Sequence, residues 1–323
     1  MPGAKVAFIH GLSAEIVDVI TSHNPDGWTT EVVPRDTPPD EQEALVNDAD
    51  FLMVYGAPLH DDVLRAAEKA RLVQLLAAGY DRMNLRLMAA LEVPCSNNGG
   101  ANSIAVADHA VMLMLALYKQ QMHTDPATRA GKWSAPITGT NTFEMADKLV
   151  GVLGLGNIGR RVARRVQGFE ARVQYFDVMP LSEDEERELG LTHVSLDELF
   201  RTSDILTCHT PLTPQTRHIV NRERLALMKP TSVLINTSRG PVVDESALIE
   251  ALQEGKIAGA GLDVFEKEPV EPDNPLLKMD NVVVTPHVAG TTWDTWFRRA
   301  AFAYENMQRV WDGEAPLATV QEY

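Results

Sequence analysis

The sequence predicts an α/β protein with two domains, each built as a doubly wound parallel sheet. The length of 323 residues is typical of about two domains. Short apolar runs alternate with helical patterns along most of the chain, as in βαβ units around parallel strands. An apolar helical pattern over residues 102–120 separates two such runs, which indicates that each run forms its own sheet.

Composition limits the function classes. Lys and Arg number 29 and Asp and Glu 45, which gives a net charge of −16, so we expect no nucleic-acid partner. The densest basic cluster, residues 160–165, is interpreted as the solvated face of a helix. No run of about 18 apolar residues occurs, so no membrane-spanning helix is expected. Two cysteines and a start without a signal-peptide pattern predict a cytoplasmic protein without a disulfide framework, and no metal site is expected.

The first α/β run predicts five strands and three helices. The strands are expected over residues 5–9, 30–33, 51–55, 72–76 and 93–96. The helices are expected over residues 14–22, 61–70 and 85–91, and residues 38–40 are expected in a loop. This alternation predicts that the first hundred residues form one parallel sheet.

The second run begins after a helix and a polar segment. The helix over residues 102–120 is apolar on nearly every side, which indicates burial on more than one face. Residues 121–146 are polar and contain two prolines and two glycines, so a long loop that binds something is expected there. Strands are then expected over residues 149–153, 173–176, 205–209, 233–236, 260–264 and 282–285, with helices over 158–167 and 244–254. Capping-box patterns at Ser182 and Ser195 indicate two further helix starts.

A glycine-rich turn joins the first strand of this run to its helix. Gly154, Gly156 and Gly159, with Asn157 and Ile158 between them, form a G-x-G-x-x-G pattern. Gly154 permits the tight turn, Gly156 allows close approach of a pyrophosphate, and Gly159 lets helix and strand pack closely. The N–H groups at the helix N-terminus attract an anion, so the turn predicts a dinucleotide site.

An acidic residue follows the next strand at the expected distance. Asp177 lies 21 residues after Gly156, where a carboxylate accepts hydrogen bonds from a ribose diol and repels a 2′-phosphate. This favours NAD over NADP. The alternative is a glycine-rich turn that binds nothing, which the joint presence of strand, helix and acid disfavours.

Three later segments follow predicted strands and carry ionisable side chains. Residues 236–240 contain Arg239, residues 263–269 contain Glu268, and residues 285–290 contain His287. Because ligands bind outside the carboxyl ends of strands in open α/β sheets, we expect the three segments to meet at one crevice.

These groups are the ones that reduction of a 2-oxo acid requires. Arg239 can pair with the substrate carboxylate and polarise the carbonyl, while His287 gives a proton to the carbonyl oxygen as hydride arrives. Glu268 can accept from the other imidazole nitrogen and orient the ring, and Asp263 can accept from the nicotinamide carboxamide. Considered alone, Arg239 could equally be a surface residue of a turn, and Glu268 could be a solvated acid in a loop. Their joint occurrence behind a dinucleotide motif favours catalysis.

Several motifs resemble those of the D-isomer-specific 2-hydroxyacid dehydrogenases. The motifs are the glycine-rich turn, Asn-Thr-Ser-Arg-Gly at 236–240, Asp-Val-Phe-Glu-Lys-Glu-Pro at 263–269 and Thr-Pro-His at 285–287. Further matches lie at residues 78–81, 131–133 and 210–213, and at 106–109, where Asp108 stands in place of the family's Glu. The resemblance extends from about residue 70 to residue 313.

The resemblance implies a fold and a set of binding residues. A central Rossmann NAD domain would span residues 101–288, and a flavodoxin-like substrate domain would combine residues 1–100 with 289–323. Ala78 and Gly79 would offer backbone N–H groups to the substrate carboxylate, and the arm at residues 121–146 would contribute to a homodimer. The residues implied in NAD binding, beyond the glycine-rich turn, are Asp177, Thr210, Pro211, Asn236, Thr237, Ser238, Asp263 and Gly290.

The expected function is therefore that of an NAD-dependent (R)-2-hydroxyacid dehydrogenase working as a 2-oxoacid reductase. The expected partner is a small 2-oxo or 2-hydroxy acid such as glyoxylate or hydroxypyruvate. Relatives that oxidise formate or phosphite, and corepressors that sense NAD, are the alternatives. Trp293 and Trp296 are expected either to line the substrate pocket or to pack a helix.

Overall fold

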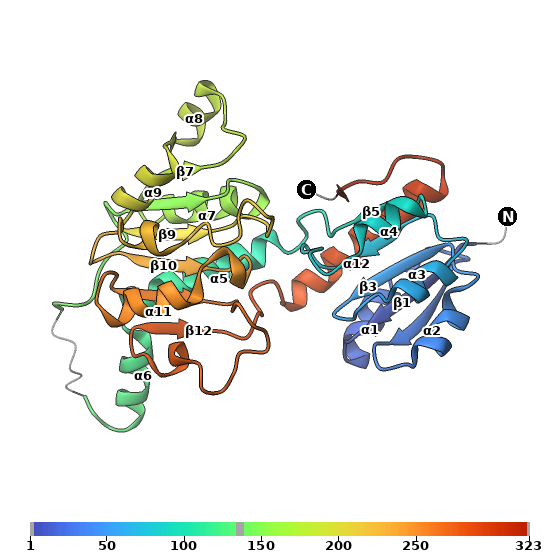
Figure 1. Cartoon of the computed structure of the whole chain (residues 1–323), viewed down its shortest axis with the longest axis horizontal. Coiled ribbons are helices and arrows are strands. Elements are labelled where there is room, and N and C mark those ends of the chain that lie inside the picture. The colour runs from blue at the N-terminus through green and yellow to red at the C-terminus, as the bar shows by residue number, and fades with distance from the viewer. Residues whose placement is uncertain (1–2, 134–138, 322–323) are drawn as a thin grey trace. The chain divides into compact units, whose positions relative to one another are not determined.

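The computed structural model describes residues 3–133 and 139–321. The chain divides into two compact units (Figure 1). Unit 1 comprises Met1–Asn102 and Thr291–Tyr323, and unit 2 comprises Ser103–Gly290. These boundaries lie two residues from the expected ones at 100 and 288.

Unit 1 contains a six-stranded sheet in the order β13-β5-β4-β3-β1-β2. The order of its five parallel strands is that of flavodoxin-like folds, and β13 joins β5 in the antiparallel sense. Helices α1 and α12 cover one face, and α2, α3 and α4 cover the other. Its strands are β1 (Lys5–His10), β2 (Thr29–Pro34), β3 (Phe51–Tyr55), β4 (Val73–Leu75), β5 (Cys95–Ser96) and β13 (Thr319–Val320). Its helices are α1 (Ala14–Thr21), α2 (Pro39–Val46), α3 (Asp61–Ala66), α4 (Leu85–Ala90) and α12 (Trp293–Trp311).

Unit 2 contains a seven-stranded parallel sheet in the order β12-β11-β10-β9-β6-β7-β8. The first six strands in chain order have the Rossmann arrangement, 3-2-1-4-5-6, and β12 extends the sheet beside β11. The strands are β6 (Leu149–Leu153), β7 (Arg172–Phe176), β8 (Leu191–His193), β9 (Ile205–Cys208), β10 (Val233–Asn236), β11 (Gly259–Leu262) and β12 (Val282–Val284).

Helices cover both faces of the unit 2 sheet. Helices α5 and α7 pack on one face through apolar residues such as Leu113 and Val162, and α9, α10 and α11 pack on the other. The helices are α5 (Ser103–Tyr118), α6 (Gln121–Arg129), α7 (Asn157–Gln167), α8 (Glu183–Leu189), α9 (Leu196–Thr202), α10 (Arg222–Leu225) and α11 (Glu245–Gln253). Two 3-10 helices lie at Gly240–Val242 and Pro275–Lys278. The buried, apolar α5 confirms the expectation of burial on more than one face.

Two expected loops are in part helical. Helix α2 begins at Pro39, inside the loop expected at residues 38–40, because proline fits the first helical position, where no N–H is needed. Helix α6 occupies the start of the loop expected at 121–146. None of its residues is buried, so no hydrophobic periodicity marks it in the sequence. Residues 134–138 of the expected arm, Pro136 included, lie outside the described part of the chain.

Three arginines of the basic cluster, Arg160, Arg161 and Arg164, are exposed, in line with the interpretation as a solvated helix face, and Arg165 is partly buried. Two of the arginines also form hydrogen bonds with a neighbouring helix. Arg161 Nε donates to Ser103 Oγ at 2.8 Å, and Arg165 Nε donates to Asp108 Oδ1 at 2.5 Å. Both bonds connect α7 to α5 and stabilise their packing.

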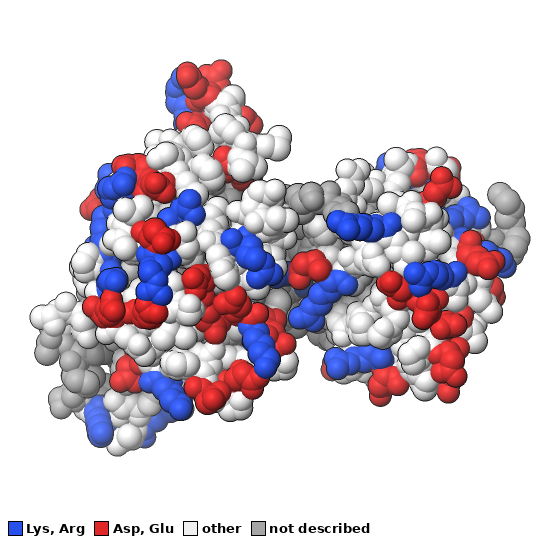
Figure 2. Space-filling view, viewed as in Figure 1, with Lys and Arg blue, Asp and Glu red and all other residues white. Residues whose placement is uncertain are grey.

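Charges of both signs are interspersed over the face drawn in Figure 2. Within residues 3–133 and 139–321, no helix is both long and apolar enough to cross a membrane. The same described ranges contain no group of three or more His, Cys, Asp or Glu arranged to hold a metal ion.

Candidate active site

The ionisable residues predicted to act in catalysis follow three neighbouring strands of unit 2. Arg239 follows β10, Glu268 follows β11, and His287 follows β12. These strands lie side by side in parallel, so their carboxyl ends share one edge of the sheet.

The structure brings Glu268 and His287 into contact. His287 Nδ1 and Glu268 Oε2 are 2.8 Å apart, and Glu268 Oε1 accepts from the N–H of Phe265 at 3.2 Å. Both carboxylate oxygens are thus engaged, which fixes the carboxylate plane and, through it, the imidazole. The hydrogen bond at Nδ1 leaves Nε2 as the ring nitrogen for a substrate, and 46% of the His287 side chain is exposed.

The charges around Glu268 keep it ionised. Burial raises the pKa of Glu268, but the hydrogen bond and charge of His287, the Phe265 N–H and the charge of Arg239 together lower it more. The pKa of Glu268 therefore lies below its ordinary value. An ionised carboxylate on Nδ1 stabilises the protonated imidazole that a general acid needs.

The loop that carries Arg239 is fixed by its own hydrogen bonds. Asn236, almost fully buried, accepts from the N–H and hydroxyl of Ser238 and donates to the carbonyl of Arg239 at 3.0 Å. Gly240 follows at a position where a Cβ would lie 1.7 Å from the carbonyl oxygen of Phe265. The loop of Arg239 therefore packs directly on the loop of Glu268, and only glycine permits this approach.

The glycine-rich turn has the geometry expected of a pyrophosphate site. Gly154 has a φ of 93°, which other residues rarely adopt, and a Cβ on Gly159 would lie 2.1 Å from the Gly154 carbonyl oxygen. A Cβ on Gly156 would have no protein atom within 4 Å. Asn157 and Ile158 are the first residues of α7, whose leading N–H groups lack acceptors within the helix. The turn thus offers N–H donors and open space together.

Asp177 lies directly after β7 and is fixed beside the turn. Its Oδ2 accepts from the N–H of Leu155 at 2.7 Å, and its Oδ1 accepts from the N–H of Met179 at 3.0 Å. The carboxylate is only partly buried. It retains lone pairs with which a ribose diol can form hydrogen bonds.

Among the residues that the structure describes, the hydroxyls of two threonines near this edge have no protein partner. Thr210 follows β9 and Thr237 follows β10, and both Oγ1 atoms are buried without a hydrogen bond. A buried hydroxyl rarely lacks a hydrogen bond unless a ligand or a water molecule supplies the partner. Pro211 is exposed, and its carbonyl accepts from Thr216. The open turn, the acid at β7 and the unsatisfied hydroxyls all fit a bound NAD.

Asp263 is buried and already hydrogen-bonded to the protein. Its side chain is 1% exposed, Oδ1 accepts from Thr285 Oγ1 and from the N–H of Val288, and Oδ2 accepts from the N–H of Ala289. The residue therefore stabilises the loop of His287, a role that the sequence did not indicate. Gly290 is partly buried at the end of the same loop.

The predicted substrate-binding residues of unit 1 follow β4. The carbonyl of Ala78 accepts from Asn97 Nδ2 at 3.1 Å. Within the described ranges, the N–H groups of Ala78 and Gly79 donate to no protein acceptor. Two adjacent free N–H groups at the end of a strand suit a carboxylate ligand.

The two tryptophans of α12 differ in exposure. Trp296 is buried and packs edge-on against Tyr55, with ring centroids 4.9 Å apart, and the Arg299 guanidinium contacts both rings. Trp296 thus packs the helix, which was one of the two expected roles. Trp293 is about half exposed and contacts Phe297 within unit 1.

The comparisons with known proteins identify the family of the chain. Residues 111–289 match the family model described as D-isomer specific 2-hydroxyacid dehydrogenase, NAD binding domain. The glyoxylate reductase of Korarchaeum cryptofilum is 39% identical over 303 residues, covering 92% of this chain and 89% of that protein. The glyoxylate/hydroxypyruvate reductase B of Yersinia pestis is 37% identical over 276 residues, 84% of each chain.

Solved structures resemble the whole chain. A glyoxylate reductase from Paecilomyes thermophila is 28% identical with a TM-score of 0.85 and 99% coverage of both chains. The D-lactate dehydrogenase from Aquifex aeolicus, complexed with NAD and lactic acid, is also 28% identical, with a TM-score of 0.82 and coverage of 95% and 96%.

The fold and site together define an NAD-dependent oxidoreductase, with its cofactor domain in unit 2. The chain belongs to the D-isomer-specific 2-hydroxyacid dehydrogenase family, as its motifs indicated.

Proposed function

We propose that the protein reduces a small 2-oxo acid, glyoxylate or hydroxypyruvate, to the corresponding 2-hydroxy acid with NADH. The glyoxylate and glyoxylate/hydroxypyruvate reductases at 37–39% identity support this substrate class. The observation that carries the proposal is the 2.8 Å pair of His287 and Glu268, which lies within the charge influence of Arg239.

The residues of the chain have separate roles in the reaction. Bound NADH supplies the hydride that the carbonyl carbon receives. Arg239 binds the substrate carboxylate and draws electrons toward the carbonyl oxygen. His287 gives the proton on Nε2 to the carbonyl oxygen and becomes neutral. Glu268 stays ionised throughout and keeps Nδ1–H in place.

An NADH-oxidation screen tests the substrate. Glyoxylate, hydroxypyruvate, pyruvate, phenylpyruvate and longer 2-oxo acids are compared by kcat/KM, each with NADH and with NADPH. We expect glyoxylate or hydroxypyruvate to give the highest value, and NADH to exceed NADPH because Asp177 repels a 2′-phosphate. An equal or higher kcat/KM with phenylpyruvate, or equally efficient NAD+ reduction in a separate assay with formate or phosphite, would refute the proposed substrate class.

Two variants test the assigned roles. His287→Ala removes the proton donor, so kcat falls by about 100-fold or more while KM changes little. Arg239→Ala removes the carboxylate partner, so KM rises and kcat falls together. Near-normal turnover of His287→Ala would show that another group supplies the proton.

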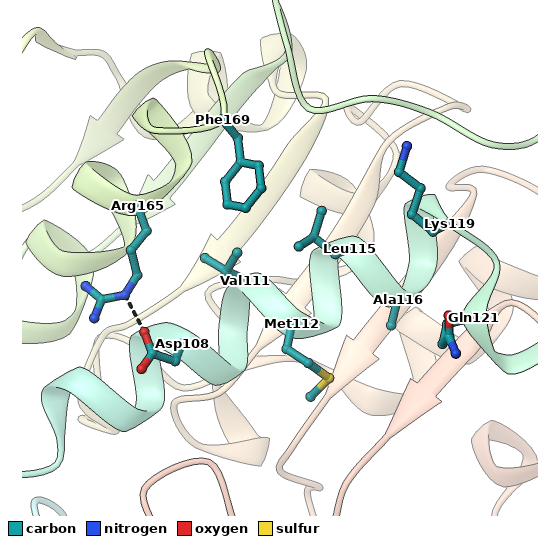
Figure 3. Close-up of a pocket in the computed structure, with 9 residues that line it drawn as sticks. All are labelled: Asp108, Val111, Met112, Leu115, Ala116, Lys119, Gln121, Arg165 and Phe169. Carbon is teal, nitrogen blue, oxygen red and sulfur yellow. Dashed lines mark hydrogen bonds and ion pairs between the residues drawn. The ribbon is translucent and has the colours of Figure 1, made fainter. Parts of the chain in front are cut away.

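We further propose that the protein forms a homodimer through the exposed apolar side of α5. Val111, Met112, Leu115 and Ala116 of α5 line a hollow together with Phe169, and in Figure 3 Val111 and Leu115 point toward the Phe169 ring. Met112 is 42% and Phe169 44% exposed, a high exposure for large apolar side chains that line one hollow. Sedimentation of Met112→Glu would detect a monomer where the wild type is a dimer. A monomeric wild type refutes this proposal.

We propose a cytoplasmic location, since Cys95 and Cys208 are both free, buried thiols. Cell fractionation with an antibody tests this location.

A further inference from the structure

The backbone of His287 adopts the left-handed conformation. Its φ is 56°, a region that costs a residue other than glycine of order 1 kcal/mol. This conformation sets the direction in which the imidazole leaves the loop. Some interaction must therefore hold the loop in place, since an extended backbone would turn the ring elsewhere.

Asp263 provides most of these contacts. Three consecutive N–H groups donate to it: His287 donates to its backbone carbonyl at 2.7 Å and also to the carbonyl of Thr285 at 3.1 Å, while Val288 and Ala289 donate to the Asp263 carboxylate at 2.9 Å each. A buried carboxylate is stable only when its hydrogen bonds are complete. The orientation of His287 thus depends on whatever else completes the Asp263 carboxylate.

The remaining partners are Thr285 and His109. Thr285 Oγ1 donates to Asp263 Oδ1 at 2.6 Å, and its one hydroxyl hydrogen is thereby used. His109 Nε2 lies 2.9 Å from the same Oγ1, so His109 must be the donor of this second bond. Burial lowers the pKa of His109 below its ordinary value although the charge of Asp263 opposes this, which favours the neutral ring. The donor role toward Thr285 places the proton of this ring on Nε2.

The chain of bonds runs from His109 on α5 through Thr285 to Asp263 and then to the backbone of residues 287–289. His109 is 176 residues from Thr285 in the sequence, and its side chain is 16% exposed. We propose that His109 and Thr285 are positioning residues. They act on the His287 loop through Asp263 and so align His287 for proton transfer, and they do not touch the substrate. This inference rests on the proposed role of His287 as the acid.

A matched pair at Thr285 tests it. Thr285→Val keeps the shape and removes the hydroxyl, so kcat should fall by about 10- to 100-fold as the ring loses alignment. KM for NADH should stay within about twofold, because the glycine-rich turn and Asp177 are untouched. Thr285→Ser restores the hydroxyl and should bring kcat back to within about threefold of the wild type.

A second pair covers the case in which Thr285→Val does not fold. His109→Phe keeps the ring shape without the donor, and His109→Gln offers an amide N–H near the position of Nε2. We expect the phenylalanine variant to lose kcat as Thr285→Val does, and the glutamine variant to keep most of it.

Three results would overturn the inference. They are equal kcat for Thr285→Val and Thr285→Ser, wild-type kcat in His109→Phe, or a loss that appears in KM for NADH and leaves kcat unchanged. Each leaves the proposed function intact as long as His287→Ala is inactive. Activity in His287→Ala, by contrast, removes the proposed acid itself.

Discussion

Glu268 and His287 lie on different loops, and one 2.8 Å hydrogen bond joins them. Glu268→Gln keeps an oxygen acceptor for Nδ1 but removes the charge that stabilises protonated His287. We expect kcat for reduction to fall by about 100-fold. NADH oxidation at saturating substrate measures this loss.

The lowered pKa of Glu268 supports this expectation. Because this pKa lies below its ordinary value, Glu268 is ionised at neutral pH, and the variant removes a charge that the wild type carries. An unchanged kcat in Glu268→Gln would mean that the carboxylate charge plays no part in proton transfer.

Substitutions at two glycines of the turn distinguish an effect on cofactor binding from an effect on folding. Gly156 has a φ of −73°, and an added Cβ would contact no protein atom, so Gly156→Ala should cost less than about 1 kcal/mol of stability. The same Cβ would enter the space expected for the pyrophosphate, so the Kd for NADH should rise at least about 10-fold. Fluorescence titration and urea unfolding measure the two quantities.

Gly159→Ala is the matched control. Its Cβ would meet the Gly154 carbonyl oxygen at 2.1 Å, so it should destabilise the fold as well as weaken NADH binding. Unimpaired NADH binding in Gly156→Ala would locate the pyrophosphate elsewhere.

Among the elements, α12 illustrates how a distant segment completes unit 1. Asn306 is fully buried and donates to Gln74 Oε1 at 2.7 Å, while its own oxygen accepts from the N–H of Leu317 at 2.6 Å. Asn306→Ala leaves these groups unsatisfied, so the free energy of unfolding should fall by about 2–4 kcal/mol. Urea unfolding followed by circular dichroism measures the loss.

Gln308 provides the control on the same helix. Its side chain forms a solvent-exposed hydrogen bond with Asp312 at 3.1 Å, so Gln308→Ala should change stability by less than about 0.5 kcal/mol. Equal effects of the two variants would mean that the buried amide contributes no more than surface contacts do.

The elements that the sequence predicted are those with a buried face. The strands over residues 51–55, 149–153 and 233–236 occur at the expected positions, because a run of apolar residues marks a buried strand. Helix α6 was missed because it buries nothing and contains Pro126, so its pattern is that of a loop. Strand β8 was missed because only the first of its three residues, Leu191, is buried, so no apolar run marks it.

The residues of the site also differ in whether the sequence could predict them. Arg239, Glu268 and His287 could be selected because the ends of parallel strands share an edge, which is a rule of topology. The bond between His109 and Thr285 could not, since it depends on how α5 lies against β12 and on the side-chain directions there. The sequence motif at 106–109 marked His109 without indicating its partner.

At the scale of the whole molecule, acid should destabilise the fold. Burial raises the pKa of Asp204, but Leu149 N–H and Lys229 lower it more, and the pKa of Asp244 lies below its ordinary value for similar reasons. Such carboxylates stabilise the fold above their unfolded pKa, and this stabilisation is lost as pH falls through the folded pKa. The net negative charge also decreases as the pH falls toward the pI of about 5.0, and the weaker self-repulsion stabilises the fold. This gain opposes the loss of stability only in mild acid.

His209 should dominate the first part of that acid loss. Burial lowers its pKa from 6.5 to about 3, so the unfolded chain takes up a proton that the folded chain refuses, and stability falls as pH drops from 6.5 toward 3. One such group gives a slope of about 1.4 kcal/mol per pH unit between pH 6 and 4. His209→Gln, whose amide can keep the bond to Thr207 Oγ1, should remove this slope and leave the steeper loss below pH 4 unchanged. Urea midpoints measured at half-unit steps compare the two proteins. Parallel curves for wild type and variant between pH 6 and 4 would show that His209 takes up its proton in the folded state.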